Sequence, residues 1–107
     1  MSVKPNSIAD MKAQQCQSEI VNILHNPINA PIGAYVVTAA HLLSIAAQYN
    51  YPFGVQFDMV LDESTKMGLY PEDAAVRTCL AKSWDDLKGL CNYYSAEDFK
   101  KAAALSI

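Results

Sequence analysis

Hydrophobic residues recur along this chain at helical spacing, and one segment is hydrophobic at nearly every position. The segment 31–49 consists mainly of Ala, Val, Leu, Ile and Tyr. Its polar positions are Thr38, His41, Ser44 and Gln48. A helix that is hydrophobic on all sides is normally surrounded by other elements. We therefore predict that this segment forms a central, buried helix.

Other segments carry hydrophobic residues on one side only, which is typical of helices at the surface of a bundle. Their expected starts follow from Ser residues with Asp three positions later, and from prolines suited to a first turn. We expect these helices to begin near Ser7, Val55, Pro71, Ser83 and Ser95. Pro27 is expected to end the helix that begins near Ser7. Gly68 is expected to lie just beyond the C-terminal end of the helix that begins near Val55, a position where glycine is favoured.

These patterns together predict an all-α fold. No segment alternates with the two-residue period of a strand, and no internal repeat is visible. Hydrophobic residues make up 51% of the chain, which is enough to form a core. We predict a single helical domain over 1–107, a compact bundle of five to six short helices around the central helix at about 31–49.

The charge distribution supports this arrangement and restricts the partners. No Asp, Glu, Lys or Arg occurs from Ile20 to Phe57, so we expect the uncharged part inside. The 8 basic and 11 acidic residues give a net charge of -3, and only Lys100 and Lys101 are adjacent basic residues. Nucleic-acid binding usually needs a basic face. We therefore expect no direct nucleic-acid binding, and another protein as the partner.

The cysteines indicate a reducing environment. Cys16, Cys79 and Cys91 are odd in number, and no CxxC pair occurs. Each falls at a hydrophobic helical position, so we expect buried free thiols rather than zinc ligands or nucleophiles. Free thiols favour a cytoplasmic location. We also expect no secretory signal, membrane span, metal or cofactor, because the corresponding patterns are absent.

One acidic pair could serve metal chemistry. Asp58 and Asp62 are four residues apart, so they share a helix face and could hold Mg²⁺. The segment 57–67 resembles one helix of the all-α, MazG-like nucleotide pyrophosphohydrolases. That family also needs an upstream Glu-Glu-x-x-Glu helix, where this chain offers only Asp10 and Glu19. We therefore retain a Mg-dependent hydrolase only as an alternative, and expect a solvated acidic helix face with Asp62 paired to Lys66.

The two histidines have different expected roles. His41 lies in the middle of the central helix, where it is either a hydrogen-bonded core residue or part of the lining of a pocket. The second possibility gives another alternative function, a helical-bundle pocket for a small hydrophobic ligand. His25 lies near the end of the first helix, where it is expected to act as a cap.

The remaining features favour a non-enzymatic protein-binding module. Aromatic residues are frequent in protein interfaces, although the same residues could close the ends of a small bundle. We predict a partner-binding site formed by Tyr51, Phe53, Asp58, Asp62, Tyr70 and Tyr93. The chain would be a small acidic cytoplasmic adaptor or an inhibitor of a larger protein, and a homodimer is possible. A bacterial or phage regulatory or anti-defence protein would fit by analogy.

Overall fold

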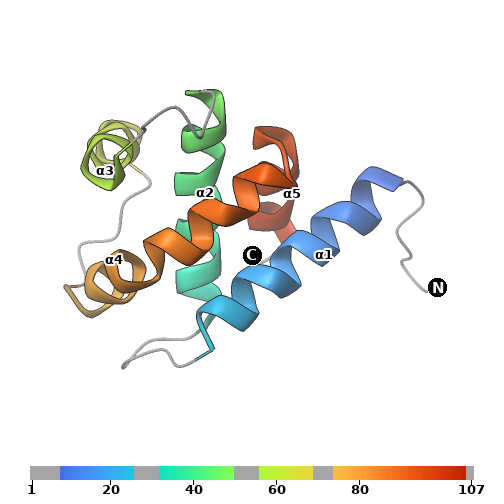
Figure 1. The fold of residues 1–107 in the computed structure, drawn as a ribbon, viewed down its shortest axis with the longest axis horizontal. Coiled ribbons are helices and arrows are strands. Elements are labelled where there is room, and N and C mark those ends of the chain that lie inside the picture. The colour runs from blue at the N-terminus through green and yellow to red at the C-terminus, as the bar shows by residue number, and fades with distance from the viewer. Residues whose placement is uncertain (1–7, 26–31, 50–55, 69–73, 106–107) are drawn as a thin grey trace.

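A computed structural model shows that the chain folds as a small bundle of α-helices (Figure 1). The structure describes residues 8–25, 32–49, 56–68 and 74–105, and these contain helices and no strand. In chain order the elements are α1 (Ile8–Ile23), α2 (Ile32–Gln48), α3 (Phe57–Lys66), α4 (Ala74–Gly89), the short 3-10 helix η1 (Leu90–Asn92) and α5 (Ala96–Leu105). The predicted all-α class is confirmed.

Helix α2 is the centre of the bundle. It contacts α1, α3, α4, η1 and α5, and its most extensive contact is with α5 (Figure 1). Ten of its residues are buried, including Tyr35, Leu42 and Leu43. The prediction of a central helix at about 31–49 is confirmed. A helix without charged residues can be surrounded on several sides, because its burial takes no charged group out of water.

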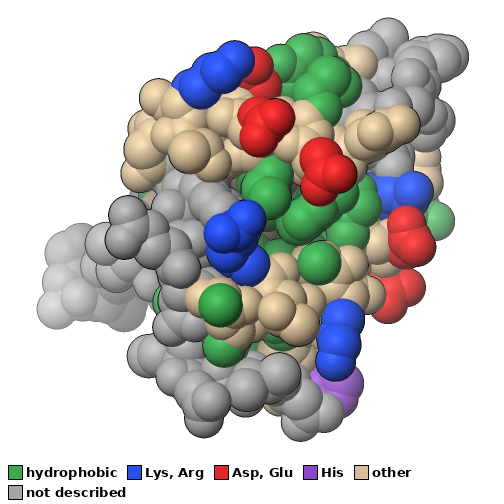
Figure 2. Space-filling view, turned by 90° about the vertical axis from the view of Figure 1, so that its left-hand side faces the viewer, with side chains coloured by type: hydrophobic (Ala, Val, Ile, Leu, Met, Phe, Trp, Pro, Cys, Tyr) green, Lys and Arg blue, Asp and Glu red, His purple; other side chains and the backbone are tan. Residues whose placement is uncertain are grey.

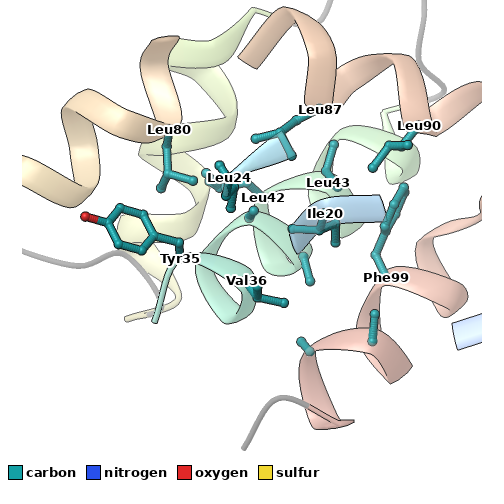
Figure 3. Packing of buried hydrophobic residues seen from close by; sticks show 14 of the residues in the cluster. Ile20, Leu24, Tyr35, Val36, Leu42, Leu43, Leu80, Leu87, Leu90 and Phe99 are labelled. Carbon is teal, nitrogen blue, oxygen red and sulfur yellow. The ribbon is translucent and has the colours of Figure 1, made fainter. Parts of the chain in front are cut away.

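The core is formed by the hydrophobic stripes of the outer helices packed on α2 (Figure 3). Ile20 and Leu24 extend from α1, Leu80 and Leu87 from α4, and Phe99 from α5. Small residues allow the closest approach: Ala39, Ala40 and Ala46 of α2 and Ala102 and Ala103 of α5 are all buried. The radius of gyration, 13.1 Å, is the value of about 13 Å expected for a compact chain of this length.

Local capping interactions define three helix ends as the sequence predicts. Before α5, the backbone N–H of Ser95 donates to Asp98 Oδ2 at 2.8 Å, and the N–H of Asp98 donates to Ser95 Oγ at 3.3 Å. This reciprocal pair is a capping box. After α3, Gly68 has a φ of +72°, which favours glycine. After α1, His25 Nδ1 donates to the carbonyl of Asn22 at 2.9 Å.

One predicted boundary is wrong. We expected a helix to begin at Ser83, but α4 passes through this position without a break. The hydrophobic positions Val76, Leu80, Trp84 and Leu87 continue at helical spacing across it, and all are buried. Ser83 does not cap a helix, because the chain is already helical on both sides of it. Continuous burial against α2 therefore outweighs the local capping signal.

A polar seam joins α1 to the start of α5. The hydroxyl of Tyr94 donates a hydrogen bond to the Glu19 carboxylate. Lys12 Nζ lies 5.9 Å from the centre of the Tyr94 ring and 3.9 Å from Asp98 Oδ2. These contacts fix the turn after η1 against α1, since Tyr94 is buried and its hydroxyl needs a partner.

The described helices do not reach across a bilayer. Within the part of the chain that the structure describes, none is both long enough and hydrophobic enough to cross a membrane.

Candidate functional site

Two consecutive helices, α3 and α4, form a surface hollow. Helix α3 contributes Phe57, Asp58 and Leu61, and α4 contributes a second set at the same spacing. The second set is Arg77, Thr78 and Ala81. In each helix these positions are i, i+1 and i+4, so each wall is one turn of helix. We call this feature the α3–α4 hollow.

The hollow is open to solvent and of moderate size. Its volume is about 270 Å³. Pockets that enclose small molecules usually measure roughly 300–1,000 Å³. The α3–α4 hollow is therefore suited to a side chain presented by a partner rather than to enclosing a whole ligand.

An aromatic pair joins the two helices next to the hollow. The rings of Phe57 and Trp84 are 4.9 Å apart with their planes at 62°, an edge-to-face contact. Trp84 lies one turn beyond Ala81 on α4 and is buried, whereas Phe57 is half-buried. The contact joins the first turn of α3 to the middle of α4, so it holds the two walls at a defined separation.

The two walls carry opposite charges. Asp58 lies on the α3 wall, and Asp62 is exposed one turn further along the same helix. Arg77 lies on the α4 wall. Figure 2, which looks onto this side of the molecule, shows hydrophobic side chains between acidic side chains above and a basic side chain below. The lining of the hollow thus combines hydrophobic side chains with one acidic and one basic residue.

Three of the six residues predicted for partner binding lie on the described surface. Asp58, Asp62 and Tyr93 are all exposed. Tyr51, Phe53 and Tyr70 lie outside the described residues. The expected pairing of Asp62 with Lys66 is replaced, because Lys66 Nζ lies 3.4 Å from Glu63 Oε1.

Tyr93 is far from the two acidic residues. It follows η1, beyond the C-terminal end of α4, whereas Arg77 and Thr78 lie in the first turns of that helix. The 16 residues of α4 span about 24 Å at 1.5 Å per residue. The structure therefore brings Asp58 and Asp62 to one place and Tyr93 to another. The Tyr93 side chain is 72% exposed, as its position beside the buried Tyr94 predicts.

The two alternative functions depend on other features. For a metal-dependent hydrolase, the relevant finding is that the described residues contain no group of three or more His, Cys, Asp or Glu placed to hold a metal ion. For a ligand pocket, the relevant residue is His41, which is half-buried on α2 and does not line the α3–α4 hollow. Burial lowers the pKa of His41, so its neutral form is favoured.

The thiols have the character of core residues. Cys16 and Cys79 are buried, Cys91 is half-buried in η1, and all three are free. Burial raises the pKa of Cys16 to about 12, with further contributions from Asp98 and Glu19, and burial raises that of Cys91 to about 11. Because the thiolate is the nucleophile, these raised pKa values keep both groups in the less nucleophilic thiol form at neutral pH.

The sequence pattern did not identify the α4 wall. Arg77, Thr78 and Ala81 are ordinary exposed positions of an amphipathic helix. These residues line the hollow because α3 lies beside α4, and no local sequence pattern specifies that placement. A signal was available only for α3, where a hydrophobic pair (Phe57, Leu61) and an acidic pair (Asp58, Asp62) run side by side.

No protein-family model, curated protein or solved structure matches this chain.

Proposed function

We propose that this chain is a non-enzymatic protein-binding module, an adaptor or inhibitor that engages a larger protein through the α3–α4 hollow. The main supporting observation is the hollow itself, an open depression whose lining combines hydrophobic side chains with one acidic and one basic residue. Protein interfaces combine a hydrophobic centre with a polar rim, and partners are selected by complementary charge.

Exposed methionines on and just after α3 add hydrophobic surface outside the hollow. Met59 of α3 is 43% exposed and Met67, just after α3, is 61% exposed. Methionine is common at interfaces because its unbranched side chain adapts to different partners. Met59 lies two positions after Phe57, so it points to a different side of α3 from the hollow.

The proposal can be tested by covalent capture in cells that make the protein. A photoreactive amino acid is placed at Thr78, on the wall of the hollow, and in a second protein at Lys100, which is exposed on α5. We expect one defined cross-linked product from Thr78 and none of the same mass from Lys100. Mass spectrometry then identifies the partner, which is purified for binding measurements.

A matched pair of substitutions distinguishes specific binding from chance contact. Ala81→Phe fills the hollow, whereas Ala104→Phe adds the same ring at an exposed position of α5. We expect Ala81→Phe to weaken binding of the captured partner more than tenfold and Ala104→Phe to change it less than twofold. Equal products from Thr78 and Lys100, or equal affinities for the two variants, would contradict the proposal.

A further inference from the structure

We propose that the α3–α4 hollow receives one aromatic side chain of the partner, and that basic residues close to it in the partner chain pair with Asp58 and Asp62 on α3. The partner segment is thus an exposed loop or chain end that carries an aromatic residue between arginines or lysines. This inference rests on the proposed function, since it names the kind of partner that the same hollow accepts.

The dimensions of the hollow fit a single side chain. Its volume is about 270 Å³, and it is open to solvent. Each wall is one helical turn, from Phe57 to Leu61 on α3 and from Arg77 to Ala81 on α4. The partner therefore has to present only one side chain there, and an irregular segment can do so.

The hydrophobic lining favours an aromatic ring. Phe57 and Leu61 are both half-buried, so each keeps some exposed surface that a partner can remove from water. The Phe57 ring already makes an edge-to-face contact with Trp84. A ring from the partner adds a further contact of this kind, which is more favourable than its buried area alone would give. Large aromatic side chains are also frequent among the residues that contribute most to binding.

The acidic residues of α3 determine what lies beside the ring. Asp58 and Asp62 each follow a hydrophobic residue of the lining, so they are turned about 100° further round the helix. Both are exposed, and neither forms an ion pair with another described residue. They are one turn apart, about 5–6 Å between Cβ atoms, so one partner segment can place a basic group on each.

The charge of the whole chain has the same sign. The 11 acidic and 8 basic residues give a net charge of -3, which attracts a basic segment before contact is made. Arg77, the basic residue of the lining, lies on the opposite wall and already has an interaction within the protein. The preference for basic neighbours therefore comes from the exposed edge of α3, where Asp58 and Asp62 lie.

Trp84 reports whether the hollow is occupied. It is the single tryptophan of the chain and contacts Phe57, so its indole N–H gives one NMR signal that shifts when a ring packs beside Phe57. This signal and those of the α3 backbone N–H groups are followed during titration with end-blocked peptides. The peptides are Arg-Gly-Phe-Gly-Arg, Glu-Gly-Phe-Gly-Glu and Arg-Gly-Ala-Gly-Arg. In an extended segment, residues two positions apart face the same side, so charge and ring are presented together.

We expect the peptide with Arg and Phe to bind about fivefold more tightly than the one with Glu and Phe, because each exposed ion pair contributes modestly. Loss of the ring should weaken binding about tenfold. In the variant Asp58→Asn, Asp62→Asn the preference for Arg over Glu should fall below about twofold. The matched control, Asp86→Asn, Glu97→Gln, removes two charges at exposed positions outside the hollow and should keep the preference.

The outcomes separate this inference from the proposed function. Equal affinity for the Arg and Glu peptides, or a preference that the control variant also loses, would overturn the basic neighbours. Equal affinity with and without the ring, or a Trp84 signal that no peptide shifts, would overturn the aromatic side chain. The proposed function is decided independently, because cross-linking at Thr78 and the Ala81→Phe variant detect a partner of any sequence.

Discussion

Ser64 shows how a single polar atom inside this bundle affects stability. Its side chain is buried in α3, and its Oγ has no hydrogen-bond partner among the described residues. A buried hydroxyl without a partner has lost its water without compensation. We therefore expect the folded chain to be less stable with serine at position 64 than with a smaller, apolar residue there.

The first prediction concerns this residue. Ser64→Ala is expected to raise the free energy of unfolding by about 1 kcal/mol, because it removes the unpaired hydroxyl and places a better helix former in α3. Urea denaturation followed by circular dichroism measures the change. Ser18→Ala, at an exposed position of α1, is the control for helix propensity alone. A loss of stability in Ser64→Ala would show that the hydroxyl has a partner.

The second prediction concerns the buried thiols Cys16 and Cys91. Burial raises the pKa of both thiols above the ordinary range for a cysteine, to about 12 for Cys16 and about 11 for Cys91. Between pH 9 and these values the unfolded chain loses protons that the folded chain keeps. Folding stability is therefore fully present below about pH 9 and falls as the pH rises, by up to about 1.4 kcal/mol per pH unit for each thiol.

Denaturation with urea at pH 8 and pH 10 tests this dependence. The double variant Cys16→Ala, Cys91→Ala is less stable at pH 8 because it leaves cavities, but its stability should change less between the two pH values. The change in the free energy of unfolding with pH is thus measured separately from the stability that the variant loses through its cavities. Equal slopes for the native chain and the variant would contradict the role assigned to the thiols.

At the scale of elements, two similar serine motifs have different outcomes. Ser95 and Asp98 form the capping box of α5, whereas Ser83 lies inside α4 with Asp86 three positions later. The local sequence is the same kind of signal in both cases. The difference arises because the hydrophobic stripe of α4 continues past Ser83 to Trp84 and Leu87, which are buried. Packing decides between a helix start and a helix interior.

These two serines provide a matched experiment. Ser95→Ala is expected to lower the free energy of unfolding by about 1 kcal/mol, because the first turn of α5 loses its cap. Ser83→Ala is expected to change it by no more than about 0.5 kcal/mol, because no helix begins there. Thermal and urea denaturation of both variants measure the difference. A larger loss for Ser83→Ala than for Ser95→Ala would contradict the continuous α4.

At the scale of the whole molecule, the bundle separates its surface into distinct regions. The α3–α4 hollow lies beside the first turns of α4, and Tyr93 lies beyond the other end of that helix. The seam of Lys12, Glu19, Tyr94 and Asp98 lies between α1 and α5. Helix α2 occupies the centre of the bundle, and these regions lie on the helices around it.

The distance between the hollow and Tyr93 leads to a further prediction. Tyr93→Ala is expected to leave the free energy of unfolding within about 0.5 kcal/mol of the native value, because the side chain is 72% exposed. It is expected to reduce affinity for the captured partner less than Ala81→Phe does. Calorimetric titration of both variants compares them. An equal or greater loss for Tyr93→Ala would place this tyrosine at the centre of the interface.

The amino-acid sequence determined the features that depend on neighbouring residues along the chain. Nearly continuous hydrophobicity identified α2 as the central helix, and Gly68 and Ser95 marked helix ends. The hydrophobic and acidic stripes of α3 were visible as i, i+4 pairs. Such signals act within one or two helical turns, so they can be recognised without knowing the fold.

Only the tertiary structure decided the features that join distant residues. The Tyr94–Glu19 hydrogen bond spans 75 positions, and Phe57 meets Trp84 across two different helices. The α4 wall of the hollow, with Arg77 and Ala81, became part of a site only when α3 was placed beside it. The relative position of two helices depends on how their side chains pack on α2, and this is a property of the whole core rather than of any local pattern.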